Sequence, residues 1–600
     1  MHFQKRLLAT AIAFGLSSAA QAFEFTNAYI LGDSLSDAGQ YGARFTTNPG
    51  LTASEYLAIR YGFTLKPSTQ GGTDYAFGGA RVTTQGTYNP QATPVGGQVT
   101  ALITASGGTL DSGALYILQG GPNDIFYHVG LVGAGAESSA AAQAAVGVAA
   151  TDFLANIVRL RAAGARYIVV MNLPDMGRTP AGTAGGAAAI GALSGLSVSV
   201  FNSILNNGLN SIGFDVIPAN VQGLFGEILA NPSLYGITNT TIPACTVSSS
   251  LACTPNTLVN ATAPNNYLFA DGVHPTTAAH KLVAQYIASI ITAPEQIGLL
   301  AEAPMAVSAG QGRLIEARTQ APSGPKGSAN VYGSYEFANA DIDSSAATIG
   351  SKGDVSALNV GGDLQLTDDM RAGILFGYSE NKADFGGGTG GFKLKEAMFT
   401  TYAAINRGLW YAGGSFGAGD LKYKNVHRNI ELGPAVRTEA GTTKGNHIVA
   451  KLVGGMNFSA GNFSHGPIAS VTYQQIKVNG FAEDGAASTT MLFTEQTRKS
   501  LLTSIGYLVS TRMGIAQPWV RVAWENEHKN DGREVRASLV TMGGSFGLPA
   551  YKVDDNYGKV DVGVAAEFSK GLSGYVNYNT TFSQANQKNQ AVMVGLRVSM

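Results

Sequence analysis

The final segment of the chain places the tightest limit on the fold. From Val592 to Met600 every second residue is apolar, and a methionine, a glycine, an arginine and a serine stand between them. A period of two is that of a β-strand whose two faces carry different side chains. The same alternation runs through residues 372–378 and 560–564. Such strands form either a membrane β-barrel with an apolar outer face or a soluble β-sandwich, and the pattern alone does not separate the two.

The N-terminus has the three parts of an export signal. Lys5 and Arg6 supply positive charge, an apolar stretch follows, and Ala20-Gln21-Ala22 is a small-x-small cleavage site. We predict a signal peptide over residues 1–22 and a mature chain that begins at Phe23. Beyond the signal, no run of about 18 consecutive apolar residues is available to cross a bilayer as a helix. Export and alternation together favour the membrane barrel over the soluble sandwich.

Charged residues divide the mature chain into two halves. Residues 23–292 contain 22 charged side chains, whereas residues 293–600 contain 55. Residues 293–325 hold four prolines and many small residues, as linkers do, and their apolar and charged residues also fit helical pieces of mixed polarity. We therefore predict a linker over 293–325 and an antiparallel transmembrane barrel over 326–600, for which about 12 strands is a sensible number.

The N-terminal half has a different period. Short runs of β-branched and aromatic residues alternate with helical stretches such as 140–162, which predicts a parallel sheet with helices on its faces. The last helix follows Pro275 and carries one apolar stripe, so it should cover one face of that sheet. The expected strands are 28–31, 115–118, 167–171 and 214–217.

Three motifs in this half stand beside the expected strand ends or before the last helix. Gly32-Asp33-Ser34-Leu35 follows the first strand, Gly121-Pro122-Asn123-Asp124 follows the second, and Asp271-Gly272-Val273-His274 precedes the last helix. The carboxyl ends of parallel strands lie at one sheet edge, where open α/β sheets bind their ligands. We expect the three motifs to meet there.

The residue types in these motifs indicate nucleophilic catalysis. Ser34 would stand at a strand-to-helix turn, exposed to a substrate carbonyl. At a spacing of three, Asp271 can hold the Nδ1–H of His274, which leaves Nε2 to take the Ser34 proton. The side-chain amide of Asn123 can donate to a developing oxyanion.

The order of the motifs resembles that of the GDSL or SGNH hydrolases, over residues 23–292. Tyr75-Ala76-Phe77-Gly78-Gly79-Ala80 resembles the family's second block, and Asn172-Leu173-Pro174-Asp175-Met176-Gly177 resembles a stretch of its lipase-like branch. This resemblance implies a flavodoxin-like α/β/α sandwich that hydrolyses esters without a cofactor or a metal.

The same resemblance implies an oxyanion hole. Its donors would be the backbone N–H groups of Ser34 and Gly79 and the side-chain amide of Asn123. Gly78 remains the alternative to Gly79.

The second half resembles the translocator domain of the autotransporters. The likeness depends on the domain order, the linker before the barrel, the stretch Pro518-Trp519-Val520-Arg521-Val522-Ala523-Trp524-Glu525 and the alternating final strand. It departs at the terminus, where Met600 stands in place of the usual aromatic residue. The resemblance implies that the linker threads the barrel as a helix; a tether outside the barrel is the alternative.

Two serines outside these motifs match a catalytic pattern by chance. Ser415 and Ser545 each lie within a G-x-S-x-G sequence. Neither opens a helix after a buried strand, and both fall in barrel-patterned sequence. We therefore predict that they occupy lumen-facing or turn positions.

Other candidate acids and bases are assigned structural roles. His280 belongs to the last helix, and His128 has no expected carboxylate neighbour except Asp124. Asp33 and Asp37 are predicted to be structural rather than catalytic.

The resulting hypothesis is a serine esterase displayed on the cell surface and anchored by its own outer-membrane barrel. It hydrolyses acyl esters through the triad Ser34, Asp271 and His274 and an acyl-enzyme intermediate. Its expected partners are an acyl ester substrate, the surrounding lipid and the barrel-assembly machinery, and it is expected to be a monomer. With a formal charge of −1, nucleic acid is not an expected partner.

Two other functions fit parts of the sequence. One is a non-enzymatic adhesin or envelope-interaction domain on a hydrolase scaffold, against which the intact motifs argue. The other is a diffusion porin, which the N-terminal half and the linker disfavour. The sequence leaves open the acyl chain, the alcohol, the physiological substrate, release of the N-terminal domain and whether Cys245 and Cys253 form a disulfide.

Overall fold

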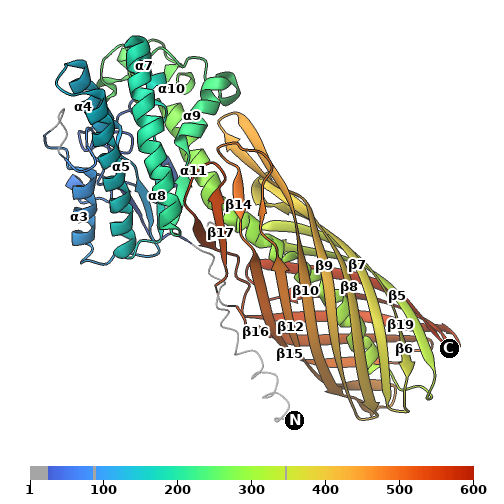
Figure 1. Cartoon of the computed structure of the whole chain (residues 1–600). Coiled ribbons are helices and arrows are strands. Elements are labelled where there is room, and N and C mark those ends of the chain that lie inside the picture. The colour runs from blue at the N-terminus through green and yellow to red at the C-terminus, as the bar shows by residue number, and fades with distance from the viewer. Residues whose placement is uncertain (1–23, 85–89, 345–347, 531) are drawn as a thin grey trace.

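The computed structural model describes residues 24–84, 90–344, 348–530 and 532–600. The expected signal peptide over 1–22 and Phe23 lie outside the described residues. A mixed helix and sheet domain stands at one end of a long antiparallel barrel, and Figure 1 shows a helix running from the first domain into the second. We call the first domain the passenger.

The passenger is built on a parallel sheet in the strand order β1-β2-β3-β4. Its central strands are buried along their whole length, as expected of strands covered on both faces. The strands are β1 (Ala28–Leu31), β2 (Leu115–Leu118), β3 (Tyr167–Met171) and β4 (Val216–Ala219). The last of them starts two residues later than predicted because Asp215 adopts a left-handed φ of 70°. Beyond β1, Asp74 makes an isolated parallel bridge to Ile30.

Helices cover both faces of this sheet. One layer contains α3, α5 and α8, and the other contains α2, α9 and α11, so the predicted α/β/α sandwich is confirmed. The helices are α2 (Ala53–Arg60), α3 (Val95–Ala105), α4 (Pro122–Gly133), α5 (Ser139–Ala162), α6 (Pro180–Ala184), α7 (Gly186–Ser194), α8 (Ser203–Ile212), α9 (Val221–Ala230), α10 (Ala263–Asn266), α11 (Thr277–Gly298) and α12 (Ala303–Gln320), with a π-helix over Gly195–Asn202.

The second half is a closed barrel of 12 antiparallel strands, as predicted. Pairing of β21 with β5 and of β10 with β12 completes the ring, while β11 (Phe458–Ala460) is a short addition beside β12. The strands are β5 (Ala329–Ile342), β6 (Ser351–Gln365), β7 (Met370–Phe385), β8 (Gly390–Arg407), β9 (Trp410–Leu432), β10 (Ala435–Met456), β12 (Phe463–Val478), β15 (Gln496–Thr511), β16 (Ala516–Glu527), β19 (Asn556–Ser569), β20 (Leu572–Phe582) and β21 (Gln587–Ser599).

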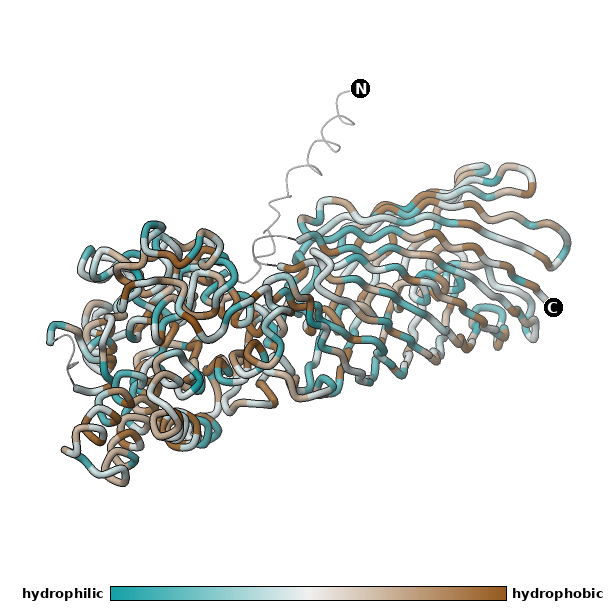
Figure 2. The backbone as a smooth tube through the Cα atoms, turned by 90° about the horizontal axis from the view of Figure 1, so that it is seen from above, coloured by the Kyte–Doolittle hydropathy of each residue, from teal (hydrophilic) through white to brown (hydrophobic). Residues whose placement is uncertain are grey.

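The outer face of the barrel is apolar. Val592, Val594 and Leu596 of β21 are exposed, whereas Met593 between them is fully buried inside, so the predicted faces of the final strand are confirmed. Figure 2 shows hydrophobic and hydrophilic segments alternating along the barrel strands. Tyr411 of β9 is buried, unlike the neighbouring Trp410, which is exposed.

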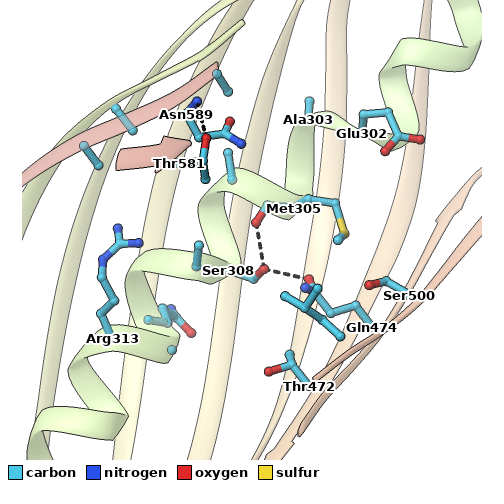
Figure 3. Close-up of a pocket in the computed structure, with 18 of the residues that line it drawn as sticks. Glu302, Ala303, Met305, Ser308, Arg313, Thr472, Gln474, Ser500, Thr581 and Asn589 are labelled. Atoms are coloured by element: carbon cyan, nitrogen blue, oxygen red, sulfur yellow. Dashed lines mark hydrogen bonds between the residues drawn. The ribbon is translucent and has the colours of Figure 1, made fainter. Parts of the chain in front are cut away.

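Helix α12 lies inside the barrel and is held there by ion pairs. Arg318 binds Asp363 at 2.7 and 3.0 Å, and Arg313 Nη2 lies 2.6 Å from Glu336. Glu316 pairs with Lys451. The polar lining around the N-terminal part of the helix appears in Figure 3, where the Ser308 hydroxyl donates to Gln474 Oε1 at 2.7 Å. The helix therefore occupies the lumen beside a pocket that helix and wall residues line together, and its polar side chains match those of the wall.

Helix α11 connects the two domains without a break at the predicted boundary. It begins after Thr276, whose hydroxyl caps Ala279 N–H at 3.3 Å, and it runs through Pro294 to Gly298. The predicted limit between residues 292 and 293 thus falls inside a helix. Pro294, one of the four prolines that suggested a linker, is accommodated within the last turns of α11.

A small sheet from the barrel loops packs against the passenger. It is formed by β13 (Phe481–Ala482), β14 (Met491–Phe493), β17 (Glu534–Leu539) and β18 (Phe546–Pro549). These strands contact α11 and β4, and one apolar cluster runs from Tyr286 of α11 to Val535 of this loop sheet. Glu227 of the passenger also binds Arg437 of β10 at 2.7 Å. The passenger and the loop end of the barrel therefore share one core.

A buried ion pair at this junction gives a test of the shared core. Arg428 binds Glu483 at 2.6 and 2.7 Å, donates to Ser289 of α11 at 3.2 Å, and is 1% exposed. Arg428→Ala leaves Glu483 buried without its cation, so we expect a loss of about 3–5 kcal/mol in the free energy of unfolding. Thermal and urea unfolding of the detergent-solubilised protein, followed by near-UV circular dichroism, measures it.

The matched control is Arg407→Ala in β8. Arg407 pairs with Asp369 at 3.0 Å, but their side chains are 58% and 44% exposed, so its removal should change the stability by no more than about 1 kcal/mol. Equal losses for the two variants would contradict the assignment of Arg428 to a buried junction.

Candidate active site

The three motifs meet at the carboxyl edge of the passenger sheet. Ser34 follows β1, Asn123 lies in the first turn of α4 after β2, and the segment with Asp271 and His274 precedes α11. Ser34 is 8% exposed, so only a small part of its surface reaches solvent.

Ser34 stands in a turn rather than at the start of a helix. The N–H groups of Ser36 and Asp37 donate to the Asp33 carbonyl at 3.1 Å, and the next helix, α2, begins only at Ala53. The Asp37 carboxylate accepts the N–H groups that follow, including that of Gly39, whose φ is +119°. This local capping competes with a helix, which explains the difference from the expected strand-to-helix turn.

A chain of hydrogen bonds joins the serine, the histidine and the aspartate. His274 Nε2 lies 2.9 Å from Ser34 Oγ, and His274 Nδ1 lies 2.8 Å from Asp271 Oδ2. Because a carboxylate can only accept, Nδ1 carries the hydrogen and Nε2 is left as the acceptor for the Ser34 hydroxyl. The geometry matches what the spacing of Asp271 and His274 predicts.

The environment of Asp271 keeps its carboxylate charged. Burial alone would raise the pKa of Asp271, but the hydrogen bond and charge of His274, together with backbone N–H groups, outweigh burial and lower that pKa. The N–H groups of Val273 and His274 donate to Oδ1 at 2.9 and 2.8 Å, and that of Ser250 donates to Oδ2 at 2.7 Å. Asp271 is thus a fixed anion behind the imidazole.

The turn beside Ser34 distinguishes the two candidate glycines. The N–H of Gly78 is used within the protein, because it donates to Asp37 Oδ2 at 2.9 Å. Gly79 has a φ of +84°, which favours glycine. Asn123 Nδ2 donates to the Ala80 carbonyl at 2.9 Å, which uses one of its two N–H groups and ties α4 to this turn.

Asp33 has the structural role that we expected. It is fully buried; its carboxylate accepts the N–H of Leu35 at 3.0 Å and the amide of Gln119 at 2.9 Å. Burial raises its pKa to about 6. It holds the turn that contains Ser34 against the end of β2.

The other histidines of the passenger lie away from the serine. His280 is buried, accepts the N–H of Ala53 at 3.2 Å, and burial lowers its pKa to about 3. His128 Nδ1 lies 2.8 Å from Glu137, so the expectation that Asp124 is its only nearby carboxylate is wrong. Asp124 is instead bound by Arg81 at 3.0 Å.

The two serines of the G-x-S-x-G sequences are remote from this site. Ser415 belongs to β9 and lines the lumen. Ser545 lies between β17 and β18, where its hydroxyl donates to the Gly213 carbonyl at 3.1 Å. Both therefore have the lumen and turn positions that we predicted.

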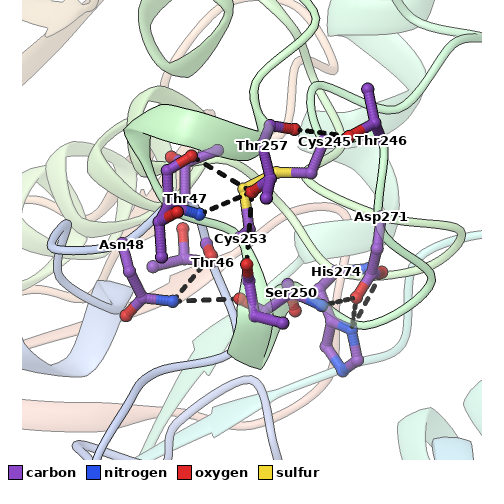
Figure 4. Close-up of a disulfide and its surroundings, with 12 residues drawn as sticks. Thr46, Thr47, Asn48, Cys245, Thr246, Ser250, Cys253, Thr257, Asp271 and His274 are labelled. Carbon is purple, nitrogen blue, oxygen red and sulfur yellow. Dashed lines mark hydrogen bonds and ion pairs between the residues drawn. A yellow bond between two sulfur atoms is a disulfide. The ribbon is translucent and has the colours of Figure 1, made fainter.

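Sequence reasoning missed one part of the site. Cys245 and Cys253 form a disulfide with a Cα–Cα distance of 5.7 Å, and the loop between them supplies the Ser250 N–H that binds Asp271 (Figure 4). A backbone donor leaves no mark in a sequence, and the paired cysteines were the only available signal. In the described part of the chain, no group of three or more His, Cys, Asp or Glu side chains is placed to hold a metal.

Comparison with known proteins identifies the class of both domains. Residues 29–287 match the family model of the GDSL-like lipases/acylhydrolases, and residues 331–579 match that of the autotransporter β-domain. A Pseudomonas putida protein, described as an uncharacterized protein in the trpE-trpG intergenic region, is 33% identical over 580 residues, which cover 88% of this chain and 94% of that protein. The chain belongs to the GDSL-like lipases/acylhydrolases that are joined to an autotransporter β-domain.

Similar proteins include enzymes of the same domain order. Esterase EstA of Pseudomonas aeruginosa is 28% identical, with 96% of each chain covered, and Lipase 1 of Photorhabdus luminescens is 24% identical, with 98% of each covered. The solved translocator domain of the autotransporter NalP from Neisseria meningitidis covers 50% of this chain and 98% of its own, at 17% identity and a TM-score of 0.41. By its family membership, the chain itself is a carboxylic ester hydrolase of the outer membrane, with its passenger outside the cell.

The raised pKa of Asp33 predicts a pH-dependent stability. Between pH 3.8, its ordinary pKa, and about 6, the folded state holds a proton that the unfolded chain has released. The free energy of unfolding therefore falls as pH rises through this window, by up to about 3 kcal/mol. Asp33→Asn removes this contribution, so the difference in unfolding free energy between wild type and variant should fall from pH 4 to pH 6 and then level off. Denaturant titrations at several pH values measure it; parallel pH curves for the two proteins would refute it.

Proposed function

We propose that Ser34, His274 and Asp271 are the nucleophile, base and orienting acid of an ester hydrolase. The observation that carries this proposal is the hydrogen-bonded chain from Ser34 Oγ through both His274 nitrogens to Asp271, at 2.9 and 2.8 Å. These distances lie within the range in which a base activates a hydroxyl.

The reaction follows in two halves. Ser34 Oγ attacks the ester carbonyl while His274 Nε2 takes its proton, and the tetrahedral intermediate collapses as Nε2 gives that proton to the leaving alcohol. Water then loses a proton to Nε2 and attacks the acyl-Ser34. The acid is released when Ser34 recovers its proton from His274. Asp271 keeps the Nδ1–H hydrogen bond and stabilises the imidazolium in both halves.

The oxyanion would be held by the N–H groups of Ser34 and Gly79 and by Asn123 Nδ2. Two contacts support this choice: Gly78 N–H is used by Asp37, and Asn123 has one N–H group left beyond its bond to Ala80. Backbone and amide donors that are fixed before the reaction stabilise charge that develops in the transition state.

Display at the surface completes the proposed function. We infer that residues 1–22 direct export, that the barrel-assembly machinery inserts the barrel, and that the protein acts as a monomer. The closed ring of strands supports the last inference, because it leaves no barrel edge for a second copy to pair with.

Replacement of the nucleophile tests the proposal directly. Ser34→Ala should lower kcat for a short-chain p-nitrophenyl ester by at least about 10⁴-fold and abolish fluorophosphonate labelling, with display on intact cells preserved. Ser415→Ala and Ser545→Ala are the matched controls and should retain wild-type rates. Covalent labelling that survives Ser34→Ala would refute the assignment, and a folded wild type without any esterase activity would favour a binding function instead.

A second variant tests the oxyanion hole. Asn123→Ala should lower kcat by about 10²-fold with little change in KM, because its donor is used in the transition state. Steady-state kinetics with the same ester measure this, and unchanged thermal unfolding excludes a folding defect. An increase in KM at constant kcat would assign Asn123 to substrate binding.

A further inference from the structure

A loop closed by a disulfide reaches the acid of the triad from outside its own turn. The loop runs from Cys245 to Cys253, and Figure 4 shows it beside Asp271 and His274. We propose that this disulfide loop positions the carboxylate of Asp271 for catalysis through the backbone N–H of Ser250. The inference rests on the proposed function and assigns a positioning residue to that site.

The contact on Asp271 is short and buried. Ser250 N–H donates to Oδ2 at 2.7 Å, and Asp271 is 3% exposed. The other described donors to this carboxylate are Val273 N–H, His274 N–H and His274 Nδ1, all from the same turn. His274 Nδ1 lies 2.8 Å from Oδ2 and 2.9 Å from Oδ1. Ser250 therefore fixes one of the two oxygens that orient the imidazole, from a segment 21 residues away.

The disulfide ties both sides of this contact together. Cys245 N–H donates to the carbonyl of Ala270 at 3.0 Å, and Ala270 directly precedes Asp271. Cys253 follows Ser250 by three residues. The disulfide thus closes a covalent ring. One cysteine is hydrogen-bonded next to the acceptor, Asp271, and the other stands close to the donor, Ser250. Both cysteines pack with Ala270 in a small apolar cluster, so the ring has a core of its own.

The ring is also fixed to the segment that follows the nucleophile. Asn48 Nδ2 donates to the Ser250 carbonyl at 2.9 Å, and Asn48 N–H donates to the Cys253 carbonyl at 3.1 Å. Two residues earlier, the Thr46 hydroxyl donates to the Pro275 carbonyl at 3.1 Å, next to His274. The loop is therefore held between the serine side and the histidine side of the site.

The backbone of Ser250, and not its side chain, makes the contact. Its buried Oγ has no hydrogen-bond partner among the described residues. Ser250 is the first residue of a 3₁₀ turn, and Ser249 before it has φ −124° and ψ 130°. Proline is tolerated at the first position of a helical turn, and its preceding residue prefers this extended conformation. The backbone therefore suits proline, and Ser250→Pro removes the donor. Because the ring carbon takes the place of the hydrogen in a contact of 2.7 Å, it also pushes the Asp271 carboxylate away from Ser250.

The test measures kcat and KM of the full-length protein with a short-chain p-nitrophenyl ester. Loss of one hydrogen bond to a charged group, together with the displaced carboxylate, predicts that Ser250→Pro lowers kcat by at least about tenfold, while KM changes by less than about twofold. Ser250→Ala keeps the N–H, so its kcat should exceed that of Ser250→Pro by about the same tenfold. Equal kcat values for the two variants would overturn the proposal.

Combining Ser250→Pro with Asp271→Ala distinguishes a role in positioning Asp271 from a role in the stability of the fold. If Ser250 acts through the acid, Ser250→Pro causes no further loss of kcat in the Asp271→Ala background. If the loss of kcat persisted in the Asp271→Ala background, the loop would have a merely structural role. Cys245→Ala/Cys253→Ala opens the ring without touching Ser250 and provides the same comparison if Ser250→Pro does not fold; its loss of kcat should also vanish in the Asp271→Ala background.

Ser34→Ala keeps the two proposals distinguishable. Full activity of Ser34→Ala would refute the triad and the loop together. An inactive Ser34→Ala beside a fully active Ser250→Pro would leave the triad in place and refute only the role of the loop.

Discussion

The backbone hydrogen bonds of the barrel must all be satisfied within the protein, because the lipid around it offers neither donors nor acceptors. The pairing of β21 with β5 and of β10 with β12 meets this demand by leaving no open edge. Closure has a second effect: it turns the polar face of every strand toward an enclosed lumen. Buried charges there need partners, and α12 supplies them through Arg313, Glu316 and Arg318.

The position of the enzyme follows from that helix. Because α12 is fixed inside the barrel by its ion pairs, α11 leaves the barrel at a defined place and carries the passenger with it. The apolar stripe of α11 is then buried on two sides, by the passenger sheet and by the loop sheet. The proposed base and acid stand just before the same helix, since His274 is three residues before Thr277. One helix therefore connects the chemistry to the membrane anchor.

Features that depend on local pattern were predictable from the sequence. Alternation in the final strand predicted its two faces, and the motifs beside Ser34 and His274 predicted which side chains meet at the sheet edge. Contacts that depend on tertiary packing were not predictable. The pairing of His128 with Glu137 needed the geometry of α4, and the continuation of α11 past residue 292 needed the loop sheet that buries it. The Ser250 N–H left no mark in the sequence beyond the pair of cysteines that closes its loop.

The apolar core that the two domains share has a consequence for any release of the passenger from the cell surface. A protease that cuts one peptide bond between α11 and the first barrel strand breaks the covalent connection only. Tyr286 and its neighbours remain packed against the loop sheet, and Glu227 remains bound to Arg437. Shedding would thus require the two surfaces to separate in water, with exposure of an apolar interface on each. A nicked molecule would behave as a two-chain complex that stays at the membrane.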